Sequence, residues 1–202
     1  MINAIIFDFG DVFINLDKAA SAQAFKELGM VTPSQDLIDA NDLFEKGKIS
    51  EEEFLASFKT AIPNAATKEI KAAWNTIIGE FPLYRLEFLQ MLSQKYRLFL
   101  LTNTDKVHIK NFEKKVGISF FSDFYQCFEK VYYSFEMGMR KPEPEIFTRI
   151  LNNNGLLPKQ TLFVDDKKQN IDAAEALGIQ VWHLQVGEED VTDLFNKNFI
   201  FS

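Results

Sequence analysis

The chain has 202 residues, of which 47% are hydrophobic and 25% are charged, and its formal net charge is −7. This balance is usual for a globular protein with one domain, or one domain with an insertion. The acidic charge argues against nonspecific binding of nucleic acid or of an anionic membrane.

No apolar stretch is long enough to span a bilayer. Cys127, the single cysteine, fits a reducing compartment, and Met1-Ile2-Asn3 lacks a basic signal-peptide start. We therefore expect a cytoplasmic protein.

Short apolar runs alternate with helical patterns along most of the chain. Strand-like runs are expected at residues 4–7, 98–102, 130–134, 162–165 and 181–184. Strands separated by helices are typical of a parallel sheet with crossover helices. The sequence therefore predicts an α/β fold.

The stretch from about residue 19 to residue 79 breaks this alternation, because it contains no convincing strand. Helices are expected at residues 19–28, 34–46, 50–60 and 67–79, and Ser50-Glu51-Glu52-Glu53 is a capping box. We predict residues 17–79 as a helical cap, and residues 1–16 and 80–202 as the α/β core. The alternative is a surface subdomain without a role in binding. We favour a cap because the insertion begins beside Asp8, and lids commonly gate access to ligands.

Acidic residues follow two of the expected strands. Asp8 ends the run Ala4-Ile5-Ile6-Phe7, and Asp165-Asp166 ends the run from Thr161 to Val164. Open α/β folds bind ligands at the carboxyl edge of the sheet. Two acidic strand ends can supply the oxygen ligands that a hard cation such as Mg²⁺ prefers.

Four separated motifs stand out in the chain: Asp8-Phe9-Gly10-Asp11-Val12, Leu100-Leu101-Thr102-Asn103, Lys141-Pro142, and Phe163-Val164-Asp165-Asp166 with Asn170. Together they resemble the motifs of the haloacid dehalogenase-like (HAD) hydrolases. Each motif is weak alone, but all four occur in the family's order. The resemblance implies a Rossmann-like, three-layer parallel-sheet core with an inserted all-helical cap, and Mg²⁺-dependent hydrolysis of a phosphomonoester.

The resemblance also implies roles for the acidic residues. Asp8 would be the nucleophile and would form an aspartyl-phosphate. Mg²⁺ would be bound by Asp8, by the backbone carbonyl of Gly10 and by Asp166. Asp165 would orient the metal's ligands or waters without binding the metal itself, and Asn170 would brace the acidic loop. The choice between Asp165 and Asp166 follows the family's pattern, because spacing alone does not decide it.

The remaining motif residues would contact the phosphate. Lys141 would supply a positive charge to the phosphate and to Asp8, although most lysines are solvated surface residues. Thr102 would donate its hydroxyl to a phosphate oxygen, and Asn103 its backbone N–H. Arg140 could also reach this pocket, whereas His108 and His183 are expected to be structural.

Gly10 departs from many HAD phosphatases, which have an acid two residues after the nucleophile. General acid–base help is typically worth about 10²–10⁴-fold, and glycine cannot provide it. Asp11, Asp17 or a water could replace it, although Asp11 could equally cap the turn. The alternative is a non-hydrolytic protein that binds Mg²⁺ and phosphate. A dehalogenase is less favoured, because its chemistry needs no metal, whereas Asp165 and Asp166 beside Asp8 would repel one another without a cation. A phosphomutase is also less favoured, because its proton transfers need the missing acid.

The substrate is expected to be a small phosphorylated metabolite such as a sugar phosphate. The chain most resembles a branch of HAD enzymes, similar to sugar-phosphate phosphatases, that has an Asp-x-Gly-x-Val first motif and Gly-Met-Arg-Lys-Pro, which are residues 8–12 and 138–142 here. Asn15 and Asp17 are candidates for reading the substrate, although a hinge or helix-cap role is equally open. Phe44, Phe54, Phe58 and Trp74 could be cap core or pocket. We expect a monomer or weak homodimer.

Overall fold

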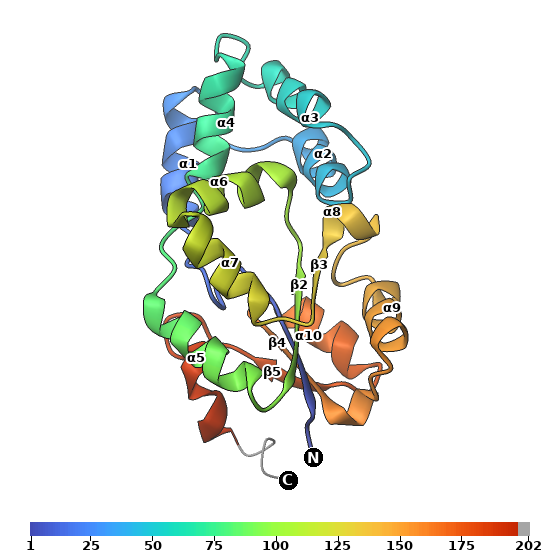
Figure 1. Cartoon of the computed structure of the whole chain (residues 1–202). Helices are drawn as coiled ribbons and strands as arrows, with labels where there is room; N and C mark the ends of the chain where they lie inside the picture. Colours follow the sequence, from blue (N-terminus) through green and yellow to red (C-terminus); the bar gives the residue numbers. More distant parts are fainter. Residues whose placement is uncertain (198–202) are drawn as a thin grey trace.

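A computed structural model describes residues 1–197 and shows a five-stranded parallel sheet at the centre of the core (Figure 1). The strand order is β3-β2-β1-β4-β5, and every neighbouring pair is parallel. The strands are β1 (Ala4–Phe7), β2 (Arg97–Thr102), β3 (Lys130–Tyr133), β4 (Thr161–Asp165) and β5 (Gln180–His183). The predicted α/β fold class is confirmed. Ser134, expected at a strand end, instead begins a short helix.

Helices cover both faces of the sheet and make three layers. The helices α5 (Leu83–Ser93), α6 (Lys106–Val116), α7 (Ile118–Gln126) and η3 (Val191–Asn196) contribute to one apolar core with Ile5 and Phe7. The helices α9 (Pro144–Asn154) and α10 (Lys168–Glu175) contribute to a second core with Ala4 and Ile6. Successive residues of β1 therefore face opposite layers, as strand geometry requires. Two short helices, α8 (Ser134–Met137) and η2 (Pro158–Gln160), lie in loops. Among residues 1–197, no helix could cross a lipid bilayer.

A helical unit between β1 and α5 lies beyond the carboxyl ends of the strands (Figure 1). Its elements are α1 (Lys18–Glu27), α2 (Gln35–Glu45), α3 (Glu51–Ser57), η1 (Phe58–Thr60) and α4 (Thr67–Asn75). Phe44, Phe54 and Phe58 are buried in its own apolar core, where the rings of Phe44 and Phe54 stack 4.3 Å apart. We call these elements the inserted helices.

The chain enters and leaves the inserted helices through two paired segments. Leu16 forms an antiparallel bridge with Ile78, and the Gly79 N–H donates to the Asn15 carbonyl over 2.9 Å. A Cβ at residue 79 would lie 2.4 Å from that carbonyl oxygen, so glycine is required. The expected helix over 67–79 is therefore too long. It ends at Asn75, because the following residues pair with the other segment.

The inserted helices also rest directly on the core at Gly47, after α2. A Cβ at this position would lie 2.3 Å from the backbone oxygen of Phe135 in α8, and the φ of Gly47 is +63°. Lys46, at the end of α2, pairs with Glu143 of the core over 2.8 Å. These contacts hold α2 above the edge of the sheet.

Candidate active site

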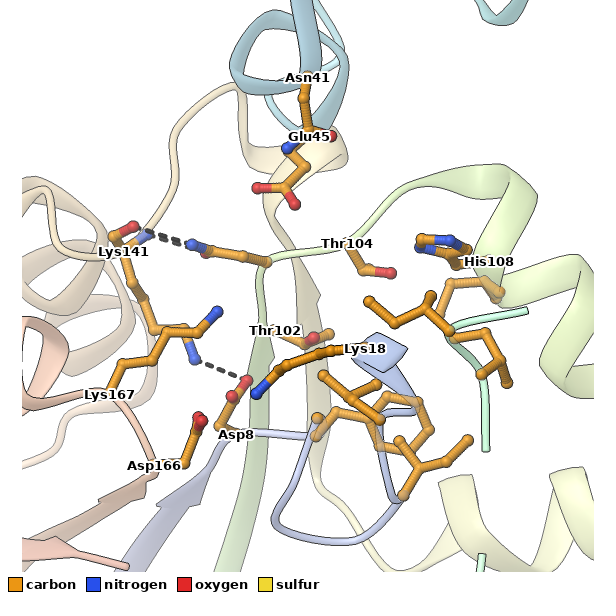
Figure 2. A pocket seen from close by; sticks show the side chains of 18 of the residues that line it. Asp8, Lys18, Asn41, Glu45, Thr102, Thr104, His108, Lys141, Asp166 and Lys167 are labelled. Atoms are coloured by element: carbon orange, nitrogen blue, oxygen red, sulfur yellow. Dashed lines mark hydrogen bonds and ion pairs between the residues drawn. The ribbon is translucent and has the colours of Figure 1, made fainter. Parts of the chain in front are cut away.

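Asp8 lies just past the end of β1, in the middle of the sheet. Its backbone N–H donates to the Val164 carbonyl over 2.9 Å and continues the strand pairing for one more residue. Its carboxylate is buried, and its Oδ1 lies 2.7 Å from the Nζ of Lys141. Figure 2 shows this pair at the base of a cavity.

Lys141 is held between two acidic residues. Its Nζ lies 2.7 Å from both Asp8 Oδ1 and Asp165 Oδ2, and its side chain is 1% exposed. The Asn103 side chain fixes its backbone, because Oδ1 accepts from the Lys141 N–H (2.9 Å) and Nδ2 donates to its carbonyl (2.8 Å). Asn103 follows β2, so the ends of three strands position one buried cation.

Burial and charge act in opposite directions on this pair. Burial raises the pKa of Asp8, the Lys141 ammonium opposes that shift, and Asp165 adds to it. Burial alone would lower the pKa of Lys141, but the two carboxylates outweigh this and raise it. The two carboxylates therefore favour the charged form of Lys141 at the base of the cavity.

Asp165 and Asp166 have different surroundings. Oδ2 of Asp165 accepts from Lys141, and its Oδ1 accepts from the Lys167 N–H (2.7 Å) and from Asn170 Nδ2 (3.0 Å). The Asp166 carboxylate is half-buried and makes no hydrogen bond or ion pair with any residue from 1 to 197. The backbone oxygen of Asp166 contacts Nε2 of His183 at 3.0 Å. Both carboxylate oxygens of Asp165 therefore accept hydrogen bonds from protein groups, whereas the Asp166 carboxylate can bind a ligand.

The acidic cluster has the chemistry of a Mg²⁺ site. Carboxylate oxygens of Asp8, Asp165 and Asp166 lie within 4.8 Å of one another. Burial raises the pKa of Asp166, and the neighbouring Asp165 raises it further. A hard cation would relieve this repulsion, and the unpaired Asp166 carboxylate could serve as one of its ligands.

A cavity of about 220 Å³ lies between this cluster and the inserted helices. It is lined by Asp8, Phe9, Gly10, Ile14, Leu16, Lys18, Asn41, Glu45, Trp74, Ile77, Ile78, Thr102, Asn103, Thr104, His108, Ile109, Lys141, Asp166, Lys167 and Asn170. The structure thus brings together the residues predicted to be catalytic, phosphate-binding or metal-binding, with Asp165 directly behind Lys141. Arg140, which was expected to be able to reach this pocket, does not line it. This volume is below the roughly 300–1,000 Å³ of pockets that bind drug-sized ligands, so the cavity suits a ligand smaller than a typical drug molecule.

Neither Asp11 nor Asp17 is placed to replace the acid that is missing at Gly10. A Cβ on residue 10 would lie 2.8 Å from Leu16 Cδ1. The Asp11 carboxylate accepts from the Leu16 N–H and from Lys18 Nζ, and it does not line the cavity. Asp17 caps α1 by accepting from the Ala20 N–H. Both acids therefore have structural contacts, which fits the turn-capping interpretation of Asp11.

Other expected candidates also make structural contacts. The Asn15 side chain accepts from Arg85 Nη1 over 2.9 Å and does not line the cavity. The ring of His108 stacks on Trp74 and contacts the Trp74 carbonyl at 3.0 Å. Nδ1 of His108 lies 3.1 Å from Asp105 at the start of the same helix, and its contacts with Trp74 join α4 to α6. Trp74 lines the cavity, whereas the three phenylalanines belong to the core of the inserted helices.

Sequence reasoning did not single out Asn41 and Glu45, which reach the cavity from α2 (Figure 2). They are four residues apart, so they share one face of the helix. On sequence alone that face reads as a solvated polar surface. Lys18 and Lys167 also line the cavity without having been singled out.

Comparison with known proteins agrees with this geometry. The family described as haloacid dehalogenase-like hydrolase matches residues 5–184. The D-ribitol-5-phosphate phosphatase of Bacteroides thetaiotaomicron is 30% identical, with 98% of this chain and all of that protein covered. A sesquiterpene phosphatase of Aspergillus oryzae is 28% identical, with 90% and 89% covered. A HAD family enzyme from B. thetaiotaomicron, solved with magnesium and inorganic phosphate, has a TM-score of 0.80 and 35% identity, with 94% and 97% covered.

The chain belongs to the haloacid dehalogenase-like hydrolase family. The predicted family is confirmed, and its relatives include phosphatases that match over most of their length.

Proposed function

We propose that this protein hydrolyses the phosphomonoester of a small metabolite, with Mg²⁺ as cofactor and Asp8 as nucleophile. The observation that carries the proposal is the buried Lys141 ammonium, 2.7 Å from Asp8 at the base of the cavity. A phosphate dianion cannot approach a buried carboxylate unless nearby cations neutralise the repulsion. The inserted helices act as a cap over this site.

The reaction has two displacements at phosphorus. An oxygen of Asp8 attacks, the bond from phosphorus to the ester oxygen breaks, and the leaving alkoxide takes a proton from a water molecule. Water then attacks the aspartyl-phosphate, the bond to Asp8 breaks, and inorganic phosphate leaves with a proton released to solvent. Lys141 stays charged throughout and stabilises the anionic phosphoryl group.

Thr102 and Asn103 bind the phosphate beside Lys141. Thr102 is buried at the end of β2 and lines the cavity, so its hydroxyl is placed to donate. The Asn103 side chain is used to hold Lys141, which leaves its backbone N–H as the second donor. Such fixed donors stabilise developing charge without reorganisation.

Mg²⁺ would be held by Asp8, Asp166 and the Gly10 carbonyl, with Asp165 and Asn170 behind them. The unpaired Asp166 carboxylate and the acidic cluster support this assignment. When bound, the ion would neutralise charge on the phosphate and orient it for attack.

The substrate is proposed to be a sugar phosphate or a related polyol phosphate. The support is the match to a D-ribitol-5-phosphate phosphatase over the whole of that protein. Cytoplasmic location and a monomeric or weakly dimeric state stay predictions.

Gly10 favours one alternative, a non-hydrolytic protein that binds Mg²⁺ and phosphate. Glycine has no side chain to transfer a proton, and the side chain of Leu16 lies where a Cβ on residue 10 would be. Phosphate release from a panel of sugar phosphates, polyol phosphates and aryl phosphates, with Mg²⁺ and with EDTA, separates the two functions. Turnover lost in Asp8→Asn supports the phosphatase. Phosphate binding without turnover on any ester favours the alternative.

A further inference from the structure

Two polar side chains of α2 face the catalytic residues from the opposite side of the cavity. Asn41 and Glu45 line the cavity with Asp8, and Figure 2 shows them descending from the inserted helices toward it. A phosphate bound at Asp8 and Lys141 would place the rest of its substrate between these two groups of residues. Asn41 and Glu45 are therefore positioned on the leaving-group side.

Both side chains contain a buried oxygen without a hydrogen bond. Within residues 1–197, Oδ1 of Asn41 and Oε2 of Glu45 have no hydrogen-bond partner. Glu45 Oε2 lies 3.0 Å from Nη2 of Arg140. The guanidinium therefore balances the charge of a Glu45 carboxylate, but the two groups do not form a hydrogen bond. Native proteins rarely leave buried polar atoms unsatisfied, so a donor from a ligand is the natural partner.

Neighbouring acids of the same helix have protein partners. Asp42 pairs with Lys46 over 2.7 Å and also with Arg140, and Asp39 accepts from Gln35 over 2.8 Å. These contacts occupy the acids that face away from the cavity. The pair of Asp42 with Arg140 also fixes α2 against the loop that contains Lys141.

The chemistry of the two oxygens selects among ligands. A carboxylate on the leaving-group portion of the substrate would be repelled by ionised Glu45, and a purely apolar group would leave both oxygens unsatisfied. Hydroxyl groups can donate to both. Burial raises the pKa of Glu45, with Arg140 opposing the shift. A hydroxyl suits either state, because it can donate to a carboxylate or accept from a carboxylic acid.

We propose that Asn41 and Glu45 are specificity-determining residues that bind hydroxyl groups on the leaving-group portion of the substrate. This rests on the proposed phosphatase function, and it narrows the substrate to polyhydroxylated phosphomonoesters. Arg140 is a positioning residue that holds Glu45 beside the loop containing Lys141.

The test compares kcat/KM for D-ribitol 5-phosphate and phenyl phosphate, which share the phosphate but differ in hydroxyl groups. Glu45→Met and Asn41→Leu should each lower the ratio of the two values at least about tenfold, the range expected when a hydroxyl contact is lost. Glu45→Gln, which keeps an acceptor oxygen, should recover much of the ratio. Asp39→Asn is the matched control on α2 and should leave the ratio unchanged, because Asp39 is exposed and outside the cavity.

Equal losses on both substrates, or an unchanged ratio in the Glu45 and Asn41 variants, would overturn the assignment. Wild-type protein that turns over neither ester would instead contradict the phosphatase function. In that case, calorimetry would still test the assignment by measuring the binding of the two esters to the same variants with Mg²⁺. The assignment predicts that the Asn41 and Glu45 variants lose their preference for binding the polyol phosphate.

Discussion

The ammonium group of Lys141 lies 2.7 Å from a carboxylate oxygen of Asp8, although the two residues come from distant parts of the chain. Both are buried, and the same ammonium group contacts Asp165 at 2.7 Å. Removing one member of such a pair leaves a charge in the protein interior without compensation. This cluster therefore links the stability of the core to the chemistry of the site.

Lys141→Met should lower the free energy of unfolding by about 3–5 kcal/mol, because it leaves Asp8 and Asp165 buried without a cation. Urea unfolding in the presence of EDTA measures the loss. The matched control is Lys168→Met, which removes an exposed i,i+4 pair with Asp172 and should cost no more than about 0.5 kcal/mol. Comparable losses in the two variants would contradict the buried-pair account.

Asp165→Asn and Asp166→Asn should separate the two neighbouring acids. Asp165→Asn removes an acceptor of Lys141 and should destabilise the metal-free protein by about 1–3 kcal/mol. Asp166→Asn removes an unpaired charge beside Asp165, so the metal-free protein should lose no stability. Unfolding curves measured in EDTA report both effects.

Mg²⁺ should raise the melting temperature of the wild-type protein and much less that of Asp166→Asn. A ligand that binds only the folded state stabilises it by about 2.7 kcal/mol at 100 times its Kd. Thermal melts with EDTA and with excess Mg²⁺ measure this difference. An equal Mg²⁺ shift in Asp166→Asn would remove Asp166 from the metal site.

His108 should make the stability fall as pH rises. Burial alone would lower the pKa of His108, but Asp105 outweighs it and the folded-state pKa is raised. The stabilisation is therefore complete below the unfolded pKa of about 6.5 and is lost as pH rises through the folded value. His108→Gln should cost about 1–3 kcal/mol near pH 6 and clearly less near pH 9. Urea unfolding at both pH values tests this, and an equal cost at both would contradict a charged His108.

Much of the site could be predicted because its residues follow strands. The carboxyl ends of parallel strands meet at one edge of the sheet. Asp8 and Asp165 were therefore expected to lie close together, and the structure places a carboxylate oxygen of each 2.7 Å from the Lys141 ammonium. Local signals also located the inserted helices, since the capping box at Ser50 begins α3 as expected.

The remaining features depend on tertiary contacts that leave no local signal. The end of α4 at Asn75 follows from the pairing of Leu16 with Ile78, which lies outside any helical pattern. Asn41 and Glu45 read as a solvated helix face until α2 is placed over the cavity. Their role depends on the docking of α2, which sequence periodicity does not encode.

The most direct test of the central claim is to trap the phosphoryl group on Asp8. The protein is mixed with Mg²⁺ and a substrate that it turns over, quenched in acid within one turnover, reduced with borohydride and analysed by peptide mass spectrometry. Reduction of an aspartyl-phosphate converts that residue to homoserine, so the account predicts homoserine at position 8 and none in Asp8→Asn. Phosphate release with an unmodified residue 8, together with normal turnover by Asp8→Asn, would contradict it.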